Sequence, residues 1–376
     1  MSARLRRTVA LPAAVAITAV LALAACTPPS PSSTPTPSAS GATPSATGSA
    51  TPTAEPEALS PEPVLDLDCG DLTTASLSGV LPGDRTLRDP GVSIMNALPT
   101  IAPVYSIRSL GGTACEWSNG VAFSPQRGFA PGYQGVRVFV LPNGTAQFDR
   151  YVEYYGSAGL SCSSDGSFCE SNDLVGTTWI GMRVEGGSSA AATSALVGEL
   201  ATVVSAAGPG ADPWLPPTGT ADLPTSCAGI VPDATVASAL GVGVPVQSVG
   251  PAGGWSLEAG ADVQNGTVRC SWLYLDSDSG VGAMGALHGG AWAWAEARPS
   301  LTAPSAPAEL AVAGLGADDE AWIRCASDGS TCTVDLVLSG NWIEFSLWPP
   351  DWAPGPAFDR RAGAEALAAA IVAAYP

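Results

Sequence analysis

The residues most able to do chemistry are two pairs of cysteines, each in an eight-residue stretch. Residues 162–169 read CSSDGSFC and residues 325–332 read CASDGSTC, so both fit the pattern C-x-S-D-G-S-x-C. Such thiols could bind a metal, form a redox pair or be joined as a disulfide. Zinc sites favour cysteines two to four residues apart, often with histidine, and a redox dithiol is typically C-x-x-C. The spacing therefore favours a disulfide in each stretch and indicates no metal site.

Asp-Gly lies at the centre of each stretch and predicts a β-hairpin with a two-residue type I′ turn. Counting outward from this turn places each cysteine opposite its partner, where Cα atoms lie about 4.5–5.5 Å apart and a disulfide can form. When Cys26 and these two short pairs are set aside, two further cysteines remain in each half of the chain. Four cysteines allow three pairings, and the short spacing favours local pairing. The expected disulfides are Cys69–Cys115, Cys162–Cys169, Cys227–Cys270 and Cys325–Cys332.

Motifs for catalysis or cofactor binding are missing or incomplete. His288 is the only histidine, so a Ser-His-Asp triad would have to use it, yet it lies in the glycine-rich stretch LHGG. The chain has no lysine and no G-x-S-x-G motif. Gly280, Gly282 and Gly285 fit G-x-G-x-x-G, but the AWAWAEA that follows alternates like a strand and opens no helix. We expect a surface or structural role for His288, no catalytic residue, no cofactor and no enzymatic activity.

Acidic residues provide weaker candidates. Asp276, Asp278 and Gly280 resemble the start of an EF-hand calcium loop, but the closing glutamate is missing. Residues 318–320, Asp-Asp-Glu, are typical of a solvated turn. Two carboxylates could serve a glycosidase, although nothing in the sequence places a pair at the needed separation. An exported hydrolase that uses a carboxylate pair therefore stays an alternative.

Tryptophans suggest a binding surface in the second half of the chain. Trp348 and Trp352 lie among prolines in LWPPDWAPGP, where they are hard to bury, so their rings could bind a sugar or an apolar ligand. Trp292 and Trp294 are expected to share one strand face. Three further tryptophans of this half are expected in the core: Trp272, Trp322 and Trp342.

The elements that position these residues occur twice. The cysteine spacing repeats, and so do Cys-x-Trp, at Cys115 and Cys270, and a tryptophan after each short pair, at Trp179 and Trp342. We therefore predict an α+β fold of two tandem domains, each a mostly antiparallel sheet with packed helices and two disulfides. The predicted boundaries are 64–208 for the first copy, 209–221 for a Pro/Gly-rich linker and 222–376 for the second copy.

Local patterns predict the individual elements. Helices are expected near 233–240, 145–155, 188–207 and 358–375, from their capping residues and apolar spacing. Strands are expected at 136–140, 179–184, 268–275 and 341–348, which are rich in β-branched and aromatic residues.

The N-terminus predicts export and lipidation. Residues 1–25 have three arginines followed by an apolar run, as in a secretory signal peptide, and Leu-Ala-Ala-Cys at 23–26 resembles a bacterial lipobox. In that resemblance Cys26 receives the lipid and becomes the mature N-terminus. Residues 26–63 are rich in Pro, Ser and Thr and predict a disordered, extended tether.

Charge limits the partners. The chain has 15 basic and 34 acidic residues, a net charge of −19, which disfavours binding to nucleic acid and to anionic lipid head groups. The expected membrane contact is therefore the lipid on Cys26.

The lipobox and tether, the Cys-x-x-Leu start at Cys69, the Cys-x-Trp core and the later Gly314-Leu315-Gly316 segment resemble actinobacterial cell-envelope lipoproteins of unknown function. The resemblance implies a lipid-anchored protein on the outer face of the cell membrane. We expect a binding or accessory role with an unknown envelope protein or small ligand as partner. The alternatives are the exported hydrolase and a structural subunit of a transport or secretion complex.

Overall fold

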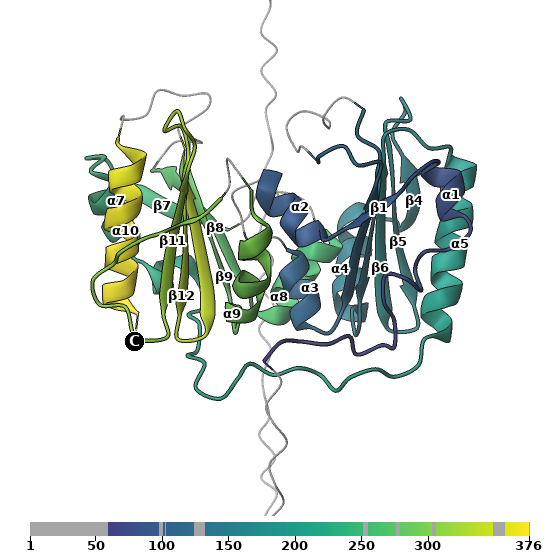
Figure 1. Cartoon of the computed structure of the whole chain (residues 1–376), viewed down its shortest axis with the longest axis horizontal. Helices are drawn as coiled ribbons and strands as arrows, with labels where there is room; N and C mark the ends of the chain where they lie inside the picture. Colours follow the sequence, from purple (N-terminus) through teal and green to yellow (C-terminus); the bar gives the residue numbers. More distant parts are fainter. Residues whose placement is uncertain are drawn as a thin grey trace, which may run out of the picture. The chain divides into compact units, whose positions relative to one another are not determined.

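The structure, a computed structural model, describes residues 59–97, 101, 103–123, 132–250, 255–275, 279–302, 306–348 and 358–375. The expected leader, Cys26, Asp276, Asp278 and Trp352 lie outside these described residues. Two antiparallel sheets, one of six strands and one of seven, form the framework of the described chain (Figure 1).

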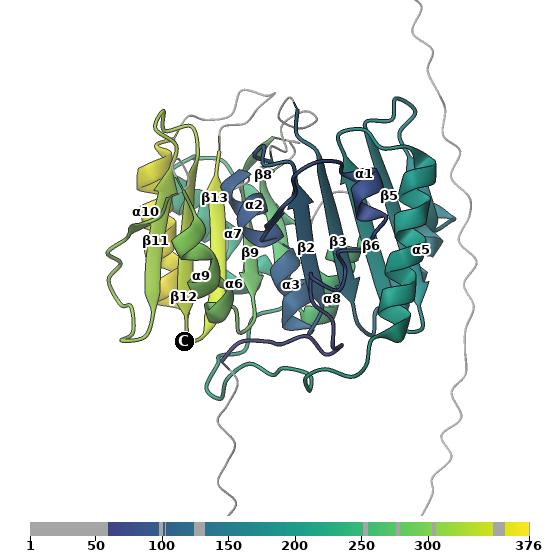
Figure 2. The same cartoon turned by 45° about the vertical axis from the view of Figure 1, so that its right-hand side comes forward.

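The first sheet has the strand order β1-β2-β3-β6-β5-β4. Its strands are β1 (Thr86–Arg88), β2 (Thr113–Ser118), β3 (Gly135–Leu141), β4 (Gly159–Cys162), β5 (Phe168–Val175) and β6 (Thr178–Glu185). Its helices are α1 (Leu77–Val80), α2 (Pro90–Ala97), α3 (Val104–Ser109), α4 (Thr145–Tyr155) and α5 (Ala190–Ala206). Helices α1 and α5 pack together, and α5 covers one face of the sheet (Figure 2). Helices α3 and α4 pack on the opposite face (Figure 1).

The second sheet has the order β7-β8-β9-β13-β12-β11-β10. Its strands are β7 (Val246–Val249), β8 (Val268–Tyr274), β9 (Gly280–Leu287), β10 (Ala308–Glu309), β11 (Glu320–Cys325), β12 (Cys332–Leu338) and β13 (Asn341–Leu347). Its helices are α6 (Cys227–Ile230), α7 (Asp233–Leu240), α8 (Leu257–Asn265), α9 (Ala291–Ala297) and α10 (Arg360–Ala374), with a 3-10 turn, η1 (Arg298–Ser300).

The two sheets repeat one topology, because β1-β2-β3-β6-β5-β4 corresponds to β7-β8-β9-β13-β12-β11, to which the second domain adds β10. The α+β prediction of two tandem sheet domains is confirmed. The four disulfides join the expected partners: Cys69–Cys115, Cys162–Cys169, Cys227–Cys270 and Cys325–Cys332. The two short ones link residues that are directly opposed on neighbouring strands, with Cα atoms 4.0 and 4.1 Å apart.

The turns inside these short disulfides differ from the predicted type I′ turn. Gly166 and Gly329 have positive φ, whereas the preceding aspartates do not. The Ser163 amide donates to the Phe168 carbonyl, so the loop between them has four residues. Asp165 accepts a hydrogen bond from the Ser167 amide, as Asp328 does from Ser330. This local bond stabilises a turn in which only glycine takes the left-handed conformation.

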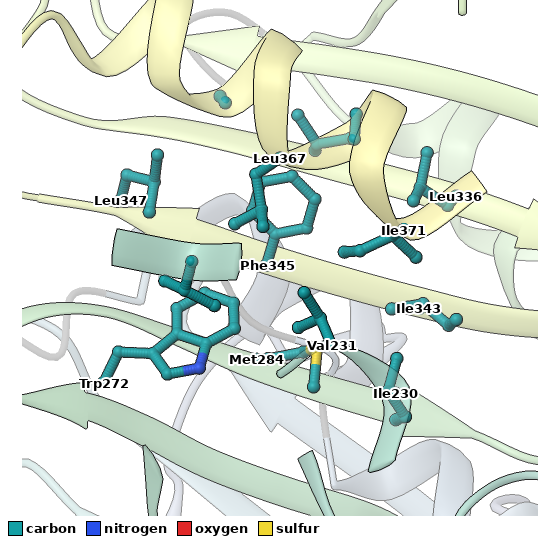
Figure 3. Packing of buried hydrophobic residues seen from close by; sticks show 14 of the residues in the cluster. Ile230, Val231, Trp272, Met284, Leu336, Ile343, Phe345, Leu347, Leu367 and Ile371 are labelled. Atoms are coloured by element: carbon teal, nitrogen blue, oxygen red, sulfur yellow. The ribbon is translucent and has the colours of Figure 1, made fainter. Parts of the chain in front are cut away.

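The outer core of the second domain packs α10 against its sheet (Figure 3). Leu367 and Ile371 of α10 meet Phe345 of β13, and Trp272 of β8 lies on the same side of the sheet (Figure 3). Each outer core contains only residues of its own domain. We infer that each domain buries one sheet face by itself.

A third cluster combines residues from both domains. Trp179 of the first domain and Trp342 of the second are fully buried in it, together with Tyr105 of α3. The Tyr105 ring centroid lies 5.6 Å from that of Trp342. Polar bonds join the domains as well, since the Ser106 hydroxyl donates to Asp262 of α8 at 2.6 Å. The inner faces of the two domains are therefore packed on each other.

AWAWAEA is not a strand, as its alternation had predicted, but helix α9. Alanine favours helix, and the helix begins after Gly290, so local propensity outweighs the two-residue alternation. Trp294 is buried against Trp342, whereas Trp292 packs against Tyr105 and Trp214. Helix α4, by contrast, has the predicted bounds.

Candidate ligand-binding site

A cavity of about 570 Å³ opens on the inner face of the first sheet, between α4 and the start of α8. We call it the interdomain cleft, because its lining combines β3–β6 and α4 of the first domain with residues 255–258 of the second. The sheet forms its floor, and the two helices form its sides.

The floor carries polar side chains because of strand register. Ser161, Glu170 and Arg183 are directly paired across β4, β5 and β6, so their side chains share one face of the sheet. The Arg183 guanidinium lies 3.6 Å from Glu170 and 2.6 Å from the buried Glu185. The floor therefore has hydrogen-bond donors and acceptors side by side, and the positive charge of Arg183 is balanced by neighbouring carboxylates.

The Asn172 side chain is held in one orientation next to these paired residues. Its Oδ1 accepts a hydrogen bond from Trp179 Nε1 at 3.1 Å, and its Nδ2 donates to the Tyr151 hydroxyl at 3.1 Å. Both the acceptor and one N–H of the amide are thereby used. The second amide N–H, for which the described chain shows no acceptor, is left for a ligand.

Aromatic rings form the α4 side of the cleft. Tyr151 and Tyr155 lie one helical turn apart, with ring centroids 4.9 Å apart. Burial raises the pKa of Tyr151, and the negative charge of Glu170 adds to the effect. The Tyr151 phenol is therefore neutral at ordinary pH. The Tyr155 side chain is about half exposed. The helix presents an apolar surface with hydroxyl groups at its edge.

Trp255 forms the opposite side. Its indole Nε1 donates to the Gln147 carbonyl of α4 at 2.9 Å, and the Arg150 guanidinium lies 4.1 Å from its ring centroid. Ser256 then caps α8 by accepting from the Ala259 amide at 3.1 Å. Residues of the second domain are thus fixed onto α4 of the first.

Gly181 makes this approach possible. A Cβ at position 181 would lie 3.0 Å from Leu257 Cδ1. Because glycine has no side chain, Leu257 of α8 can pack directly against the strand at this position. The cleft is complete only when both domains are in place.

A second cavity, of about 730 Å³, lies on the other side of the first turn of α8. Trp255 and Glu258 line both cavities. Most of its exposed lining is apolar and includes Val249, Val263 and the Cys227–Cys270 disulfide. Asp262 and Arg269, which also line it, already pair with each other.

The inner face of the second sheet is filled by a buried ionic cluster. Arg324 donates to Asp335 and Glu344, at 3.0 and 2.8 Å, and all three side chains are almost fully buried. Burial raises the pKa of Glu344 well above its ordinary value, and the charge of Asp335 adds to the rise. Neither carboxylate lines the interdomain cleft or the second cavity. We regard this cluster as structural.

The residues singled out from sequence are not brought together. Trp348 is half-buried and its amide donates to Val281, while Trp352 lies outside the described residues, so their joint surface stays a prediction. Gly280, Gly282 and Gly285 lie within strand β9, not in a loop that opens a helix. A Cβ on Gly282 would lie 2.5 Å from the Ser346 carbonyl, so this glycine permits close strand packing. His288 follows β9 and lines neither cavity.

Sequence reasoning missed the residues of the cleft: Tyr151, Tyr155, Asn172, Arg183 and Trp255. They come from four separate segments, and only the fold brings them together. The sequence offered one signal, the adjacent Tyr154 and Tyr155 at the end of a predicted helix. The structure leaves both more exposed than is usual for aromatic residues.

Compared with protein-family models, curated proteins and solved structures, the chain matches none. Among the described residues, no group of three or more metal-binding side chains is placed to hold an ion. In that same part of the chain, the helices are too short or too polar to cross a bilayer.

Proposed function

We propose that the protein is a lipid-anchored binding protein of the cell envelope that holds a small polar ligand in the interdomain cleft. One observation carries the binding role: side chains of both domains converge on one cavity that combines aromatic sides with a hydrogen-bonding floor. Such a combination of apolar surface and a few placed polar groups is typical of ligand sites. Residues of the ionic cluster fill the corresponding face of the second domain, so we assign one site to each chain.

The proposed location rests on the N-terminal sequence and on the disulfides. The lipobox resemblance at Cys26 and the Pro/Ser/Thr tether support lipid anchoring on the outer face of the membrane. Four disulfides agree with an oxidising compartment. The test is Cys26→Ala in the native host: the wild-type protein should partition into detergent and carry labelled fatty acid, and the variant should do neither. Labelling of the variant would contradict the anchor.

The binding role is tested by adjacent substitutions on α4. Tyr155 lines the interdomain cleft, whereas its neighbour Tyr154 lines the second cavity. A ligand that raises the melting temperature of the wild-type protein should lose this effect in Tyr155→Ala and keep it in Tyr154→Ala. The reverse pattern would move the site to the second cavity, and equal effects in both variants would count against the cleft.

A hydrolase is the second candidate, because Glu170 and Glu258 both line the cleft. Two carboxylates facing one ligand are the machinery of many glycosidases. If this candidate is correct, the purified protein should cleave its ligand, and Glu170→Gln and Glu258→Gln should each abolish cleavage. A ligand recovered intact after prolonged incubation would exclude it.

A further inference from the structure

We propose that the ligand of the interdomain cleft is an uncharged carbohydrate. This inference rests on the proposed binding function and specifies its ligand. It follows from three properties of the cleft: its rings, its matched charges and its position between two domains.

The rings supply the apolar surface that a sugar needs. A pyranose or furanose ring has C–H faces, which pack on aromatic rings, and an equator of hydroxyl groups. Tyr151 and Tyr155 line the cleft from α4, and Trp255 lines it from the residue just before the N-cap of α8. Trp255 is held by its bond to Gln147 and by the Arg150 guanidinium, so its orientation is set before a ligand arrives. A preorganised ring loses little conformational entropy on binding.

The floor matches hydroxyl groups rather than ions. A hydroxyl both donates and accepts, and Glu170 and Arg183 offer an acceptor beside a donor. Arg183 already pairs with two carboxylates, those of Glu170 and Glu185. Glu258 adds a further negative charge to the lining. The cleft therefore disfavours phosphates and carboxylates, in keeping with the net charge of −19 of the chain.

The polar floor also disfavours a purely apolar ligand, because covering Ser161, Asn172 and Glu170 without replacing their hydrogen bonds to water would cost free energy. A carbohydrate can replace those bonds. The volume of about 570 Å³ is within the usual range for small-ligand sites, about 300–1,000 Å³.

The test is isothermal titration of the full chain, purified in detergent, with defined probes. The neutral probes are hexasaccharides of glucan, mannan, galactan and arabinan, and the charged probes are inorganic phosphate, glutamate and a dipeptide. We expect one neutral hexasaccharide to bind. Tyr155→Ala should weaken it by about tenfold, as expected for the loss of an aromatic contact. Leu87→Ala, an exposed control on β1, should leave the affinity unchanged.

Glu170→Gln separates a neutral ligand from an anion. The substitution replaces a carboxylate acceptor and leaves Arg183 with less negative charge around it. It should therefore weaken the binding of a carbohydrate but strengthen the binding of an anion. Circular dichroism and the melting temperature confirm that each variant is folded.

The outcomes distinguish the two proposals. Binding of phosphate, glutamate or the dipeptide in the cleft, without a neutral sugar, would overturn the carbohydrate inference and leave the binding function standing. No binding of any probe would overturn both. A hexasaccharide that is bound and then cleaved would support the carbohydrate inference and replace the binding role with the hydrolase.

Discussion

The indole Nε1 of Trp342 donates a hydrogen bond to Asp335 Oδ1 at 3.1 Å. The first domain repeats this bond at the equivalent positions, where Trp179 donates to Asn172, also at 3.1 Å. In both domains the acceptor is seven residues before the tryptophan, on the neighbouring strand. The bond fixes the buried indole against its sheet and marks corresponding positions in the two domains.

The surrounding positions have diverged. Strand register aligns Ser161 with Arg324 and Gly181 with Glu344. In the second domain the charged residues fill the inner face as an ionic cluster. In the first domain the smaller residues leave room for Leu257 and for the interdomain cleft. The same sheet therefore serves as a packed core in one copy and as a binding floor in the other.

The ionic cluster predicts a large cost for removing its cation. Arg324→Met should leave Asp335 and Glu344 buried without their partner and lower the free energy of unfolding by about 3–5 kcal/mol. Urea unfolding followed by tryptophan fluorescence measures the change. The control is Arg361→Met, whose exposed pair with Glu365 should contribute about 0–1 kcal/mol. Equal effects of the two substitutions would contradict the assignment.

The raised pKa of Glu344 predicts how stability varies with pH. Burial favours the neutral acid, so the folded state keeps a proton on Glu344 at pH values where the unfolded state has lost it. Stability is therefore lost as the pH rises from the ordinary value of 4.5 toward the raised pKa. Glu344→Gln removes this titration, so the variant should gain stability relative to wild type as the pH rises above 4.5. Parallel stability curves for the two proteins would refute this.

The disulfides should differ in their contributions. On the loop-entropy estimate, the short Cys162–Cys169 loop contributes about 2.5 kcal/mol and the longer Cys69–Cys115 loop about 4 kcal/mol. Replacing each pair by serines and measuring guanidinium unfolding tests this order. A smaller loss for the longer loop would show that strain or residual unfolded structure outweighs loop entropy.

Much of the framework could be predicted from the sequence. Repeated cysteines and tryptophans predict two related sheet domains, because a disulfide and a buried indole each need a fixed partner. Helix α4 and strand β13 follow from strong local patterns. Helix α9 was missed, because over seven residues the period of two and the helical period cannot be separated when alanine is the spacer.

The cleft could not be predicted, for a physical reason. Its floor depends on the register of three strands, and its side at Trp255 depends on how the second domain packs on the first. Neither is a local property of the chain. The sequence shows adjacent tyrosines at the end of α4, but nothing in it places Trp255 opposite them.

Asp262 tests whether binding requires the packing between domains. It accepts hydrogen bonds from Ser106 of the first domain at 2.6 Å and from Arg269 of its own domain at 2.5 Å. Asp262→Ala should destabilise the protein by about 3–5 kcal/mol, because the mostly buried Arg269 loses its carboxylate partner. Loosened contact between α3 and α8 should also speed hydrogen exchange of the α8 amides and weaken ligand binding, although Asp262 does not line the cleft. The matched control is Asp212→Ala, which substitutes an exposed aspartate of the segment between the two domains. Unchanged exchange and affinity in Asp262→Ala would show that the cleft holds its shape without this contact.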